Sequence, residues 1–258
     1  MLRIAARTGR LVGLALLAGA LLAPAGAPEE VLVGAAASLA EPMAVIASGY
    51  EAAEPGARVR LVLGASNVLA EQLRAGAPLD LLISADPQLV ERLAGEGLLA
   101  ADGRRRIAGN RLVVVVRAEL AGRVSGASDL ARPEIHRIAV PDAAVPVGRY
   151  AREWLERRGL LAELAPRLVA TADARATLAA VDSGNADAAV VYATDARLVS
   201  SARLAFEIPA VEQPAIAYEA ALRAGAGAAA RGFFAHLGGA EARRILASAG
   251  FAPPPGAP

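Results

Sequence analysis

The chain has 258 residues, of which 27 are basic and 26 acidic, and 55% of its residues are apolar. It contains no Cys and two His, which excludes a disulfide framework, a thiolate zinc site, an iron–sulfur cluster and a cysteine nucleophile. All the basic residues are Arg and they form no basic tail, so the charge pattern argues against nucleic-acid binding.

The N-terminal segment, residues 1–27, has the order of a secretory signal peptide. Arg residues precede an apolar run over residues 11–23, and the segment finishes in small residues at 25–27. The thirteen apolar residues are fewer than the roughly 20 that a helix needs to cross a bilayer. We therefore expect a cleaved signal peptide, a periplasmic protein and no stable membrane insertion.

From residue 30 onward, short β-type runs alternate with Ala- and Leu-rich segments of helical period. The predicted strands are 31–34, 59–63, 79–84, 112–117, 137–140, 168–170, 188–192 and 215–222. The predicted helices are 39–53, 67–75, 87–96, 148–158, 174–183, 226–237 and 240–249. This alternation is typical of an α/β fold with mostly parallel sheets flanked by helices.

These units are more numerous than one compact sheet usually holds, and a Gly- and Arg-rich stretch, 102–110, interrupts them, which indicates two lobes. We assign residues 28–112 to lobe I, 113–205 to lobe II, and 206–251 to a segment that returns to lobe I. The tail 252–258 is rich in Pro and is predicted to be disordered. Ligands of open α/β sheets bind beyond the carboxyl ends of strands, so we expect the ligand in the cleft between the lobes.

Two Ser residues follow predicted strands where helices begin. Ser38 stands three residues before Glu41, the spacing of a capping box, so its simplest role is to cap the helix. Ser66 opens the next helix, in a turn that partly matches a nucleophile elbow and leaves an exported serine-dependent α/β hydrolase as an alternative. Against that alternative, the elbow lacks its final Gly, and neither His136 nor His236 occupies the place of a catalytic base.

Three later junctions offer further hydrogen-bond donors. Pro146 suits the first position of a helix, so Val147 presents a bare backbone N–H. Ala174 does the same at another helix start, and Tyr192 ends a buried strand with a hydroxyl. Donors without an opposing acceptor or cation favour a fully deprotonated oxyanion. Such a site leaves the proton of hydrogen phosphate unpaired, and so prefers sulfate, molybdate or tungstate to phosphate.

Four stretches of the chain carry a resemblance to a known family. They occupy residues 35–39, 75–86, 109–115 and 184–192. In this order they resemble the periplasmic molybdate-binding proteins of ABC importers, which have the two-lobed type II periplasmic-binding fold. The resemblance implies that lobe closure buries an oxyanion between two α/β lobes.

The resemblance also implies which residues hold the anion. The family's two anion-binding hydroxyls fall on Ser38 and Ser66. Its two later backbone donors fall on Val147 and Ala174, and its tyrosine hydroxyl falls on Tyr192. The residues chosen from the junctions and the residues chosen from the resemblance are therefore the same.

The chain departs from the family at two places. Residues 40–42 replace polar residues of the relatives, and residues 64–67 replace a turn that is richer in Ser. The second change leaves fewer hydroxyls near the anion, and so bears on affinity and selectivity more than on the class of ligand.

The resemblance implies a function as well. It implies high-affinity binding of molybdate and tungstate and delivery to the membrane permease subunits of an ABC importer, without catalytic residues, a cofactor or direct cation ligands. A monomer is the default for this fold class. Sulfate or another tetrahedral oxyanion is an alternative ligand, because the sequence does not give the size of the cavity. A sensory ligand-binding module is a further alternative, although no DNA-binding or transmembrane segment accompanies it.

Overall fold

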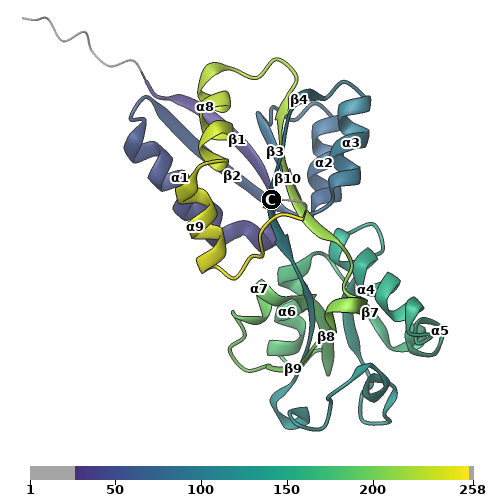
Figure 1. The fold of residues 1–258 in the computed structure, drawn as a ribbon. Coiled ribbons are helices and arrows are strands. Elements are labelled where there is room, and N and C mark those ends of the chain that lie inside the picture. Colours follow the sequence, from purple (N-terminus) through teal and green to yellow (C-terminus); the bar gives the residue numbers. More distant parts are fainter. Residues whose placement is uncertain (1–26, 256–258) are drawn as a thin grey trace, which may run out of the picture.

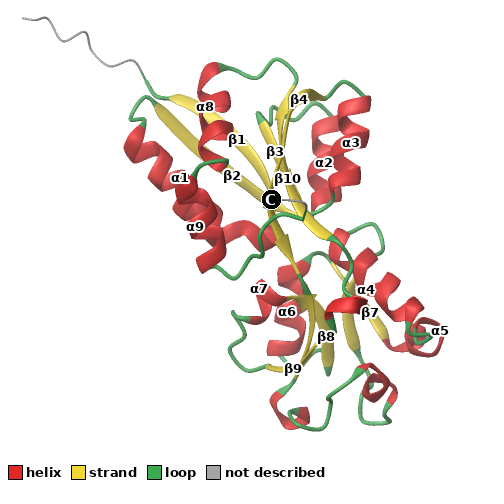
Figure 2. Cartoon of the chain, viewed as in Figure 1, coloured by secondary structure: helices red, strands yellow, loops and turns green. Residues whose placement is uncertain are grey.

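The computed structural model describes residues 27–255, so the predicted signal peptide lies outside the described residues except for its last residue. The described chain forms two lobes, each built on a five-stranded sheet with helices on both faces (Figure 1). Figure 2 shows that extended segments join the lobes. The predicted two-lobed α/β fold is confirmed. No helix within residues 27–255 has the length and apolar character that a membrane span requires.

Lobe I is built on the sheet β2-β1-β3-β10-β4. Its strands are β1 (Glu29–Ala36), β2 (Ala57–Gly64), β3 (Leu81–Ser84), β4 (Leu99–Asn110) and β10 (Ile216–Arg223). One face carries α1 (Ala40–Ala53), α8 (Ala228–Leu237) and α9 (Ala240–Ser248), and the other carries α2 (Ser66–Arg74) and α3 (Pro87–Gly95). On β3, Leu81 and Ile83 pack toward the first layer and Leu82 toward the second. These three consecutive residues of β3 are all apolar because alternate side chains of a strand point to opposite faces of the sheet, and helices cover both faces.

Lobe II is built on the sheet β7-β6-β8-β5-β9. Its strands are β5 (Leu112–Val116), β6 (Ile138–Pro141), β7 (Leu168–Thr171), β8 (Ala188–Tyr192) and β9 (Arg203–Glu207). Its helices are α4 (Pro146–Arg157), α5 (Leu161–Leu164), α6 (Ala174–Asp182) and α7 (Ala193–Ala196). On β8, Val190 packs in the cluster that contains Trp154 of α4, whereas Val191 packs with Leu178 of α6. The sheet is therefore buried on both sides.

Four of the five strands in each sheet run in the same direction. In lobe I, β1 pairs in parallel with β2 and β3, while β10 is antiparallel to both of its neighbours, β3 and β4. In lobe II, β6 pairs in parallel with β7 and β8, while β5 is antiparallel to β8 and β9. The mostly parallel sheets predicted from the sequence therefore each contain one reversed strand.

The chain passes between the lobes twice. β4 ends at Asn110 in lobe I and β5 begins at Leu112 in lobe II, and the chain returns from β9 to β10 through residues 208–215. Gln213 joins the two passages, because its Oε1 accepts from the Leu112 N–H at 2.8 Å and its Nε2 donates to the Leu112 and Ile208 carbonyls at 2.8 and 2.9 Å. The returning passage contains a short 3-10 turn (Ala210–Glu212), and two neighbouring connections of this kind are typical of a hinge between lobes.

The Gly- and Arg-rich stretch 102–110 does not interrupt the strands as predicted, because it forms most of β4. It forms a strand because it pairs with β10 along an edge of the sheet. Arg104 and Arg106 each place Nε near a carboxylate oxygen of Glu219 on β10, at 3.7 and 3.9 Å. An edge strand accommodates charged side chains that would be excluded from the middle of a sheet.

The lobe boundaries also differ from the prediction. Leu112, assigned to lobe I, begins β5 in the sheet of lobe II. Phe206 and Glu207, assigned to the returning segment, belong to β9 in the same sheet. Strand β9 was not predicted from the sequence, and its residues pair with β5 through a register shift.

The C-terminal tail is ordered as far as it is described, contrary to the prediction. Ala252 pairs with Gly109 of β4 through two backbone hydrogen bonds of 2.7 and 3.0 Å. A Cβ at Gly109 would lie 2.7 Å from the Pro253 carbonyl oxygen, so glycine allows the tail to approach the strand. Residues 256–258 lie outside the described chain.

Candidate anion-binding site

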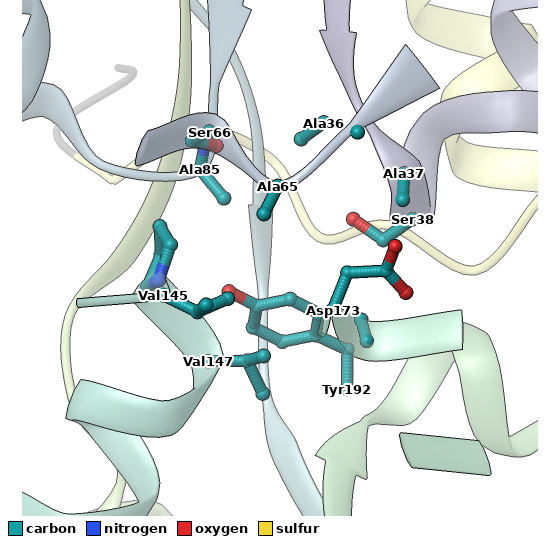
Figure 3. Close-up of a pocket in the computed structure, with 13 residues that line it drawn as sticks. Ala36, Ala37, Ser38, Ala65, Ser66, Ala85, Val145, Val147, Asp173 and Tyr192 are labelled. Carbon is teal, nitrogen blue, oxygen red and sulfur yellow. The ribbon is translucent and has the colours of Figure 1, made fainter. Parts of the chain in front are cut away.

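A small cavity lies between the two lobes, at the carboxyl ends of strands from both sheets (Figure 3). It is lined by Ala36, Ala37, Ser38, Gly64, Ala65, Ser66 and Ala85 from lobe I, and by Val145, Pro146, Val147, Asp173, Ala174 and Tyr192 from lobe II. All five residues predicted to bind the ligand are among them. The structure therefore brings together five positions that are spread over more than half of the chain.

The cavity suits a small ion. The centre of a water molecule can move through about 20 Å³ of it. A single buried water needs roughly 10–15 Å³ on this measure, whereas pockets for drug-sized ligands occupy hundreds of Å³. Small side chains line much of the wall, so backbone N–H groups can approach the contents closely.

Ser38 does not cap α1, contrary to the simplest prediction. The N-cap of α1 is Leu39, and no side chain caps the helix. Ser38 lies instead in a short 3-10 turn (Ala37–Leu39), and its Oγ is 2.8 Å from the hydroxyl oxygen of Tyr218. Its hydroxyl is thus bound to a residue 180 positions away rather than to the helix that follows it.

Asn110, the second hydrogen-bond partner of Tyr218, bears on the direction in which the Ser38 hydroxyl donates. Asn110 Oδ1 accepts from the Arg111 N–H at 2.9 Å, so its Nδ2 is the group that lies 3.3 Å from the Tyr218 hydroxyl oxygen. Tyr218 accepts from Asn110, and although either hydroxyl of the Ser38–Tyr218 pair can donate, the buried Tyr218 proton is paired only when Tyr218 donates to Ser38 Oγ. The Ser38 proton is then available to a ligand in the cavity. Burial raises the pKa of Tyr218 well above its usual range, so this donor stays protonated.

Asn110 and Tyr218 were not predicted as site residues. Asn110 lies in one of the four stretches that carry the family resemblance, which was its only signal in the sequence. Tyr218 sits in an otherwise apolar strand and is fully buried, and a buried hydroxyl requires a hydrogen-bonding partner. Both act on the cavity through Ser38.

The Ser66 hydroxyl, like that of Ser38, has a proton that is available to the cavity. It is the first residue of α2, and its Oγ accepts from the Ala85 N–H at 3.1 Å. Because a lone pair of this oxygen already receives a protein donor, its proton is available to the cavity. Both Ser side chains therefore face the cavity as donors.

Lobe II supplies two helix N-termini. Pro146 is the first residue of α4 and Val147 follows it, buried against the cavity. Ala174 is the first residue of α6, whose N-cap Asp173 accepts from the Ala176 N–H at 2.9 Å. The first amides of a helix have no intrahelical acceptors and carry a partial positive charge. Both helix ends therefore favour an anion between the lobes.

Tyr192 completes the set of donors. Figure 3 shows its ring crossing the cavity below Ala65, with the hydroxyl toward Val145. The hydroxyl is buried and finds no hydrogen-bond partner within residues 27–255. Burial raises the pKa of Tyr192 well above its ordinary value of 10.0, so the phenol stays neutral and can donate.

The predicted all-donor lining is incomplete, because Asp173 also faces the cavity. Figure 3 shows its carboxylate directed toward Ser38. From the sequence, this junction was interpreted only as the start of the helix that presents Ala174. A carboxylate contributes an acceptor and a negative charge, which oppose a bound dianion and partly offset the helix N-termini.

The cavity lacks the arrangement of a serine hydrolase. The Ser66 hydroxyl is bound to the Ala85 amide, and neither His136 nor His236 lines the cavity. Nor do residues 27–255 contain a group of three or more acidic or His side chains that could hold a metal ion.

A buried carboxylate lies behind the site. Asp195 on α7 is fully buried, and its Oδ1 is 3.3 Å from Nε of Arg175, without the geometry of a hydrogen bond. Burial raises the pKa of Asp195 from 3.8 to about 7, against the opposing effect of Arg175. The folded protein therefore holds a proton on Asp195 over a pH range in which the unfolded chain has released it.

This proton makes stability depend on pH in a defined direction. Because the folded-state pKa is raised, the protonated Asp195 contributes its full share to the free energy of unfolding below pH 4. This stabilisation is lost as the pH rises to about 7. We expect Asp195→Asn, relative to the wild type, to gain free energy of unfolding between pH 4 and 7.5, by at most about 4 kcal/mol. Denaturant unfolding at a series of pH values measures this difference.

Asp182 provides the control of opposite sign. Although burial acts to raise its pKa, hydrogen bonds from the amides of Ala202, Ser200 and Ser201 lower it. We expect Asp182→Asn to lose stability relative to the wild type as the pH rises through the acidic range. If the free energy of unfolding gained by Asp195→Asn did not change with pH, the raised pKa of Asp195 would be contradicted.

The chain is similar to several known proteins. A family model described as bacterial extracellular solute-binding protein matches residues 31–252. Molybdate-binding protein ModA of Escherichia coli (strain K12) is 32% identical over 233 residues, covering 86% of this chain and 88% of that protein.

Two solved structures show the same fold at lower identity. The periplasmic molybdate-binding protein of Azotobacter vinelandii matches with a TM-score of 0.76 and 22% identity, covering 87% of this chain and 99% of that chain. The sulfate-binding protein SubI from Mycobacterium tuberculosis H37Rv matches with a TM-score of 0.72 and 19% identity, covering 87% of each chain. The fold alone is thus compatible with more than one tetrahedral anion.

Proposed function

The chain belongs to the family of bacterial extracellular solute-binding proteins, and on that premise we propose that it binds molybdate, and also tungstate, between its lobes. The relative from Escherichia coli that spans most of this chain is a molybdate-binding protein. We further propose that Ser38, Ser66, Val147, Ala174 and Tyr192 are the residues that hold the oxyanion.

The observation that carries this proposal is the convergence of donors from both lobes on one small cavity. Ser38 and Ser66 approach from lobe I, while Val147, Ala174 and Tyr192 approach from lobe II. Hydrogen bonds from neutral donors to an anion are about twice as strong as those between neutral groups. An anion held from both sides stabilises the closed arrangement of the lobes, because in an open arrangement the anion loses the donors of one lobe.

We propose delivery to the membrane permease subunits of an ABC importer, since a closed, loaded protein differs in shape from an open one. The same proposal makes the protein a binding protein rather than an enzyme, with no cofactor, no direct cation ligand and no nucleic-acid partner. We also propose that it acts in the periplasm as a monomer, after removal of residues 1–27.

Thermal unfolding with molybdate, tungstate, sulfate and phosphate at equal ionic strength tests this function. A ligand that binds only the folded state adds about 2.7 kcal/mol at a hundredfold excess over its Kd. For a protein of this size that corresponds to a rise in Tm of roughly 5–10 °C. We expect this rise with molybdate and tungstate. A comparable rise with phosphate would show that the Asp173 carboxylate accepts the proton of hydrogen phosphate in the cavity.

The other outcomes are equally informative. An equal rise with sulfate would widen the ligand to tetrahedral dianions in general. No rise with any of the four anions, combined with turnover of an activated ester that Ser66→Ala abolishes, would replace the binding function with the hydrolase.

A further inference from the structure

Two ion pairs cross between the lobes outside the cavity. Arg149 on α4 places Nη2 3.1 Å from Oδ2 of Asp86, the N-cap of α3. Arg175 on α6 forms an ion pair with Glu41 on α1. None of these four side chains lines the cavity. The lobes are therefore tied at two points that do not touch the cavity's contents.

Each of these Arg residues sits beside a proposed anion donor. Arg149 follows Val147 by two positions on α4, and Arg175 directly follows Ala174 on α6. A helix turn is rigid on this scale, so the position of the Arg and the position of the donor amide are coupled. If the lobes separate, the ion pair and the contact between helix and anion are lost together.

Further hydrogen bonds between the lobes accompany each ion pair. The hydroxyl of Tyr150, next to Arg149, donates to the Ala85 carbonyl at 3.2 Å. Nε of Arg175 donates to the Ala37 carbonyl at 3.4 Å. Both carbonyls belong to residues that line the cavity in lobe I. The two ties therefore hold the walls of the cavity together.

Three of the four charged side chains are partly removed from water. The side chain of Asp86 is 9% exposed and that of Arg149 31%, whereas Arg175 is 26% exposed and its partner Glu41 is 61% exposed. Ion pairs on an open surface contribute little, whereas a partly buried pair leaves an uncompensated charge when one partner is removed. When the lobes open, both charges of each pair return to water. Opening therefore costs less free energy than a substitution that leaves one charge buried without its partner.

We propose that Arg149 and Arg175 are closure residues, which hold the lobes together over the bound anion and thereby slow its release. This inference rests on the proposed function, because it concerns an anion in the same cavity. Positive charge could alternatively act only by attracting the anion from a distance. Attraction of that kind mainly raises the association rate, whereas a contact made after closure lowers the dissociation rate.

Stopped-flow binding of molybdate separates the two roles. We expect Arg149→Gln and Arg175→Gln each to raise the dissociation rate by about tenfold and to change the association rate by less than about twofold. The Kd rises by a similar factor. A lower association rate with an unchanged dissociation rate would overturn the proposal in favour of attraction.

The carboxylate partners give a test in which the two roles predict opposite signs. Asp86→Asn and Glu41→Gln remove negative charge near an anion, so simple electrostatics predicts tighter binding. Loss of a closure contact predicts weaker binding and faster release. Asn is as good an N-cap as Asp, so Asp86→Asn leaves α3 capped. The control is Glu71→Gln, which removes an exposed carboxylate that is paired with Arg74 within lobe I, and should leave the Kd unchanged.

A double variant shows whether the residues act as a pair. If Glu41 and Arg175 act through each other, Glu41→Gln combined with Arg175→Gln releases molybdate no faster than Arg175→Gln alone. Independent effects that multiply in the double variant would contradict the pairing.

Lobe separation can be measured directly, because the chain has no Cys to interfere with labels. Exposed Ala52 on α1 and Ala179 on α6 are suitable for Cys substitution and spin labelling. We expect molybdate to shorten the distance between labels in the wild type, and to leave a larger open fraction in Arg149→Gln and Arg175→Gln.

The distance measurement also separates the two proposals. A wild-type protein that binds no molybdate contradicts the proposed function, and ligand-free variants that are more open than the ligand-free wild type would still support closure residues. A wild type that binds molybdate, with variants that close and release it as the wild type does, contradicts the closure residues alone.

Discussion

The triple variant Ser38→Ala, Ser66→Ala, Tyr192→Phe is expected not to bind molybdate at concentrations that saturate the wild type. Each substitution removes one side-chain donor from the cavity and leaves the backbone amides of Val147 and Ala174 in place. A hydrogen bond to a charged group contributes about 1.5–3 kcal/mol, so the loss of three weakens binding by about a thousandfold or more. Isothermal titration calorimetry measures the change in Kd.

The three single variants differ in how many hydrogen bonds within the protein each of them also removes. Tyr192 has a buried hydroxyl with no partner in residues 27–255, so Tyr192→Phe removes a donor without disturbing another group. Ser66→Ala also leaves the Ala85 amide without its acceptor, and Ser38→Ala removes one of the two hydrogen-bond partners of Tyr218. Tyr192→Phe therefore reports most directly on the anion, while the Ser variants also carry a cost in stability.

The matched control for these variants is Asp173→Asn. It changes a side chain of the same cavity, keeps a good N-cap for α6, and removes a negative charge. We expect it to bind molybdate as tightly as the wild type or more tightly. A triple variant that binds like the wild type, with an unchanged far-UV circular dichroism spectrum, would show that these hydroxyls do not hold the anion.

Gly148→Ala is expected to destabilise the protein strongly. Gly148 lies in the first turn of α4, where a Cβ would overlap the carbonyl oxygens of Asp142 and Pro141 and lie 2.7 Å from the Pro141 carbonyl carbon. Overlap with backbone is not relieved by rotating a side chain, so the turn itself must shift. We expect a loss of about 3 kcal/mol in the free energy of unfolding, or roughly 6–12 °C in Tm.

The same substitution should weaken anion binding, because it displaces the N–H of the adjacent Val147. Gly49→Ala is the control, since Gly49 lies on α1 and a Cβ added there would have no atom of another segment within 4 Å. In a helix interior this change should add about 0.5–1 kcal/mol of stability. Thermal unfolding of both variants without ligand provides the comparison, and equal stability of Gly148→Ala and wild type would show that the turn can shift at little cost.

Features that depend on neighbouring residues could be predicted from the amino-acid sequence. The alternation of apolar strands with helical segments predicted two α/β lobes, and the positions where strands give way to helices predicted five of the residues that line the cavity. Pro146 at the start of α4 and Ala174 at the start of α6 are examples. A helix start is a local property, and its free amides are exposed at its end in any fold that contains it.

Features that depend on distant partners became visible only in the folded chain. Ser38 was expected to cap a helix, yet it binds Tyr218, which no local pattern connects with it. The Arg-rich segment of β4 becomes a strand because β10 lies beside it, more than a hundred residues later in the chain. Arg149 and Arg175 each pair with a carboxylate of the opposite lobe, and these contacts exist only because the two lobes lie side by side. Local sequence sets which groups a residue can offer, whereas packing of distant segments sets which partner each group meets, and closure between the lobes depends on those partners.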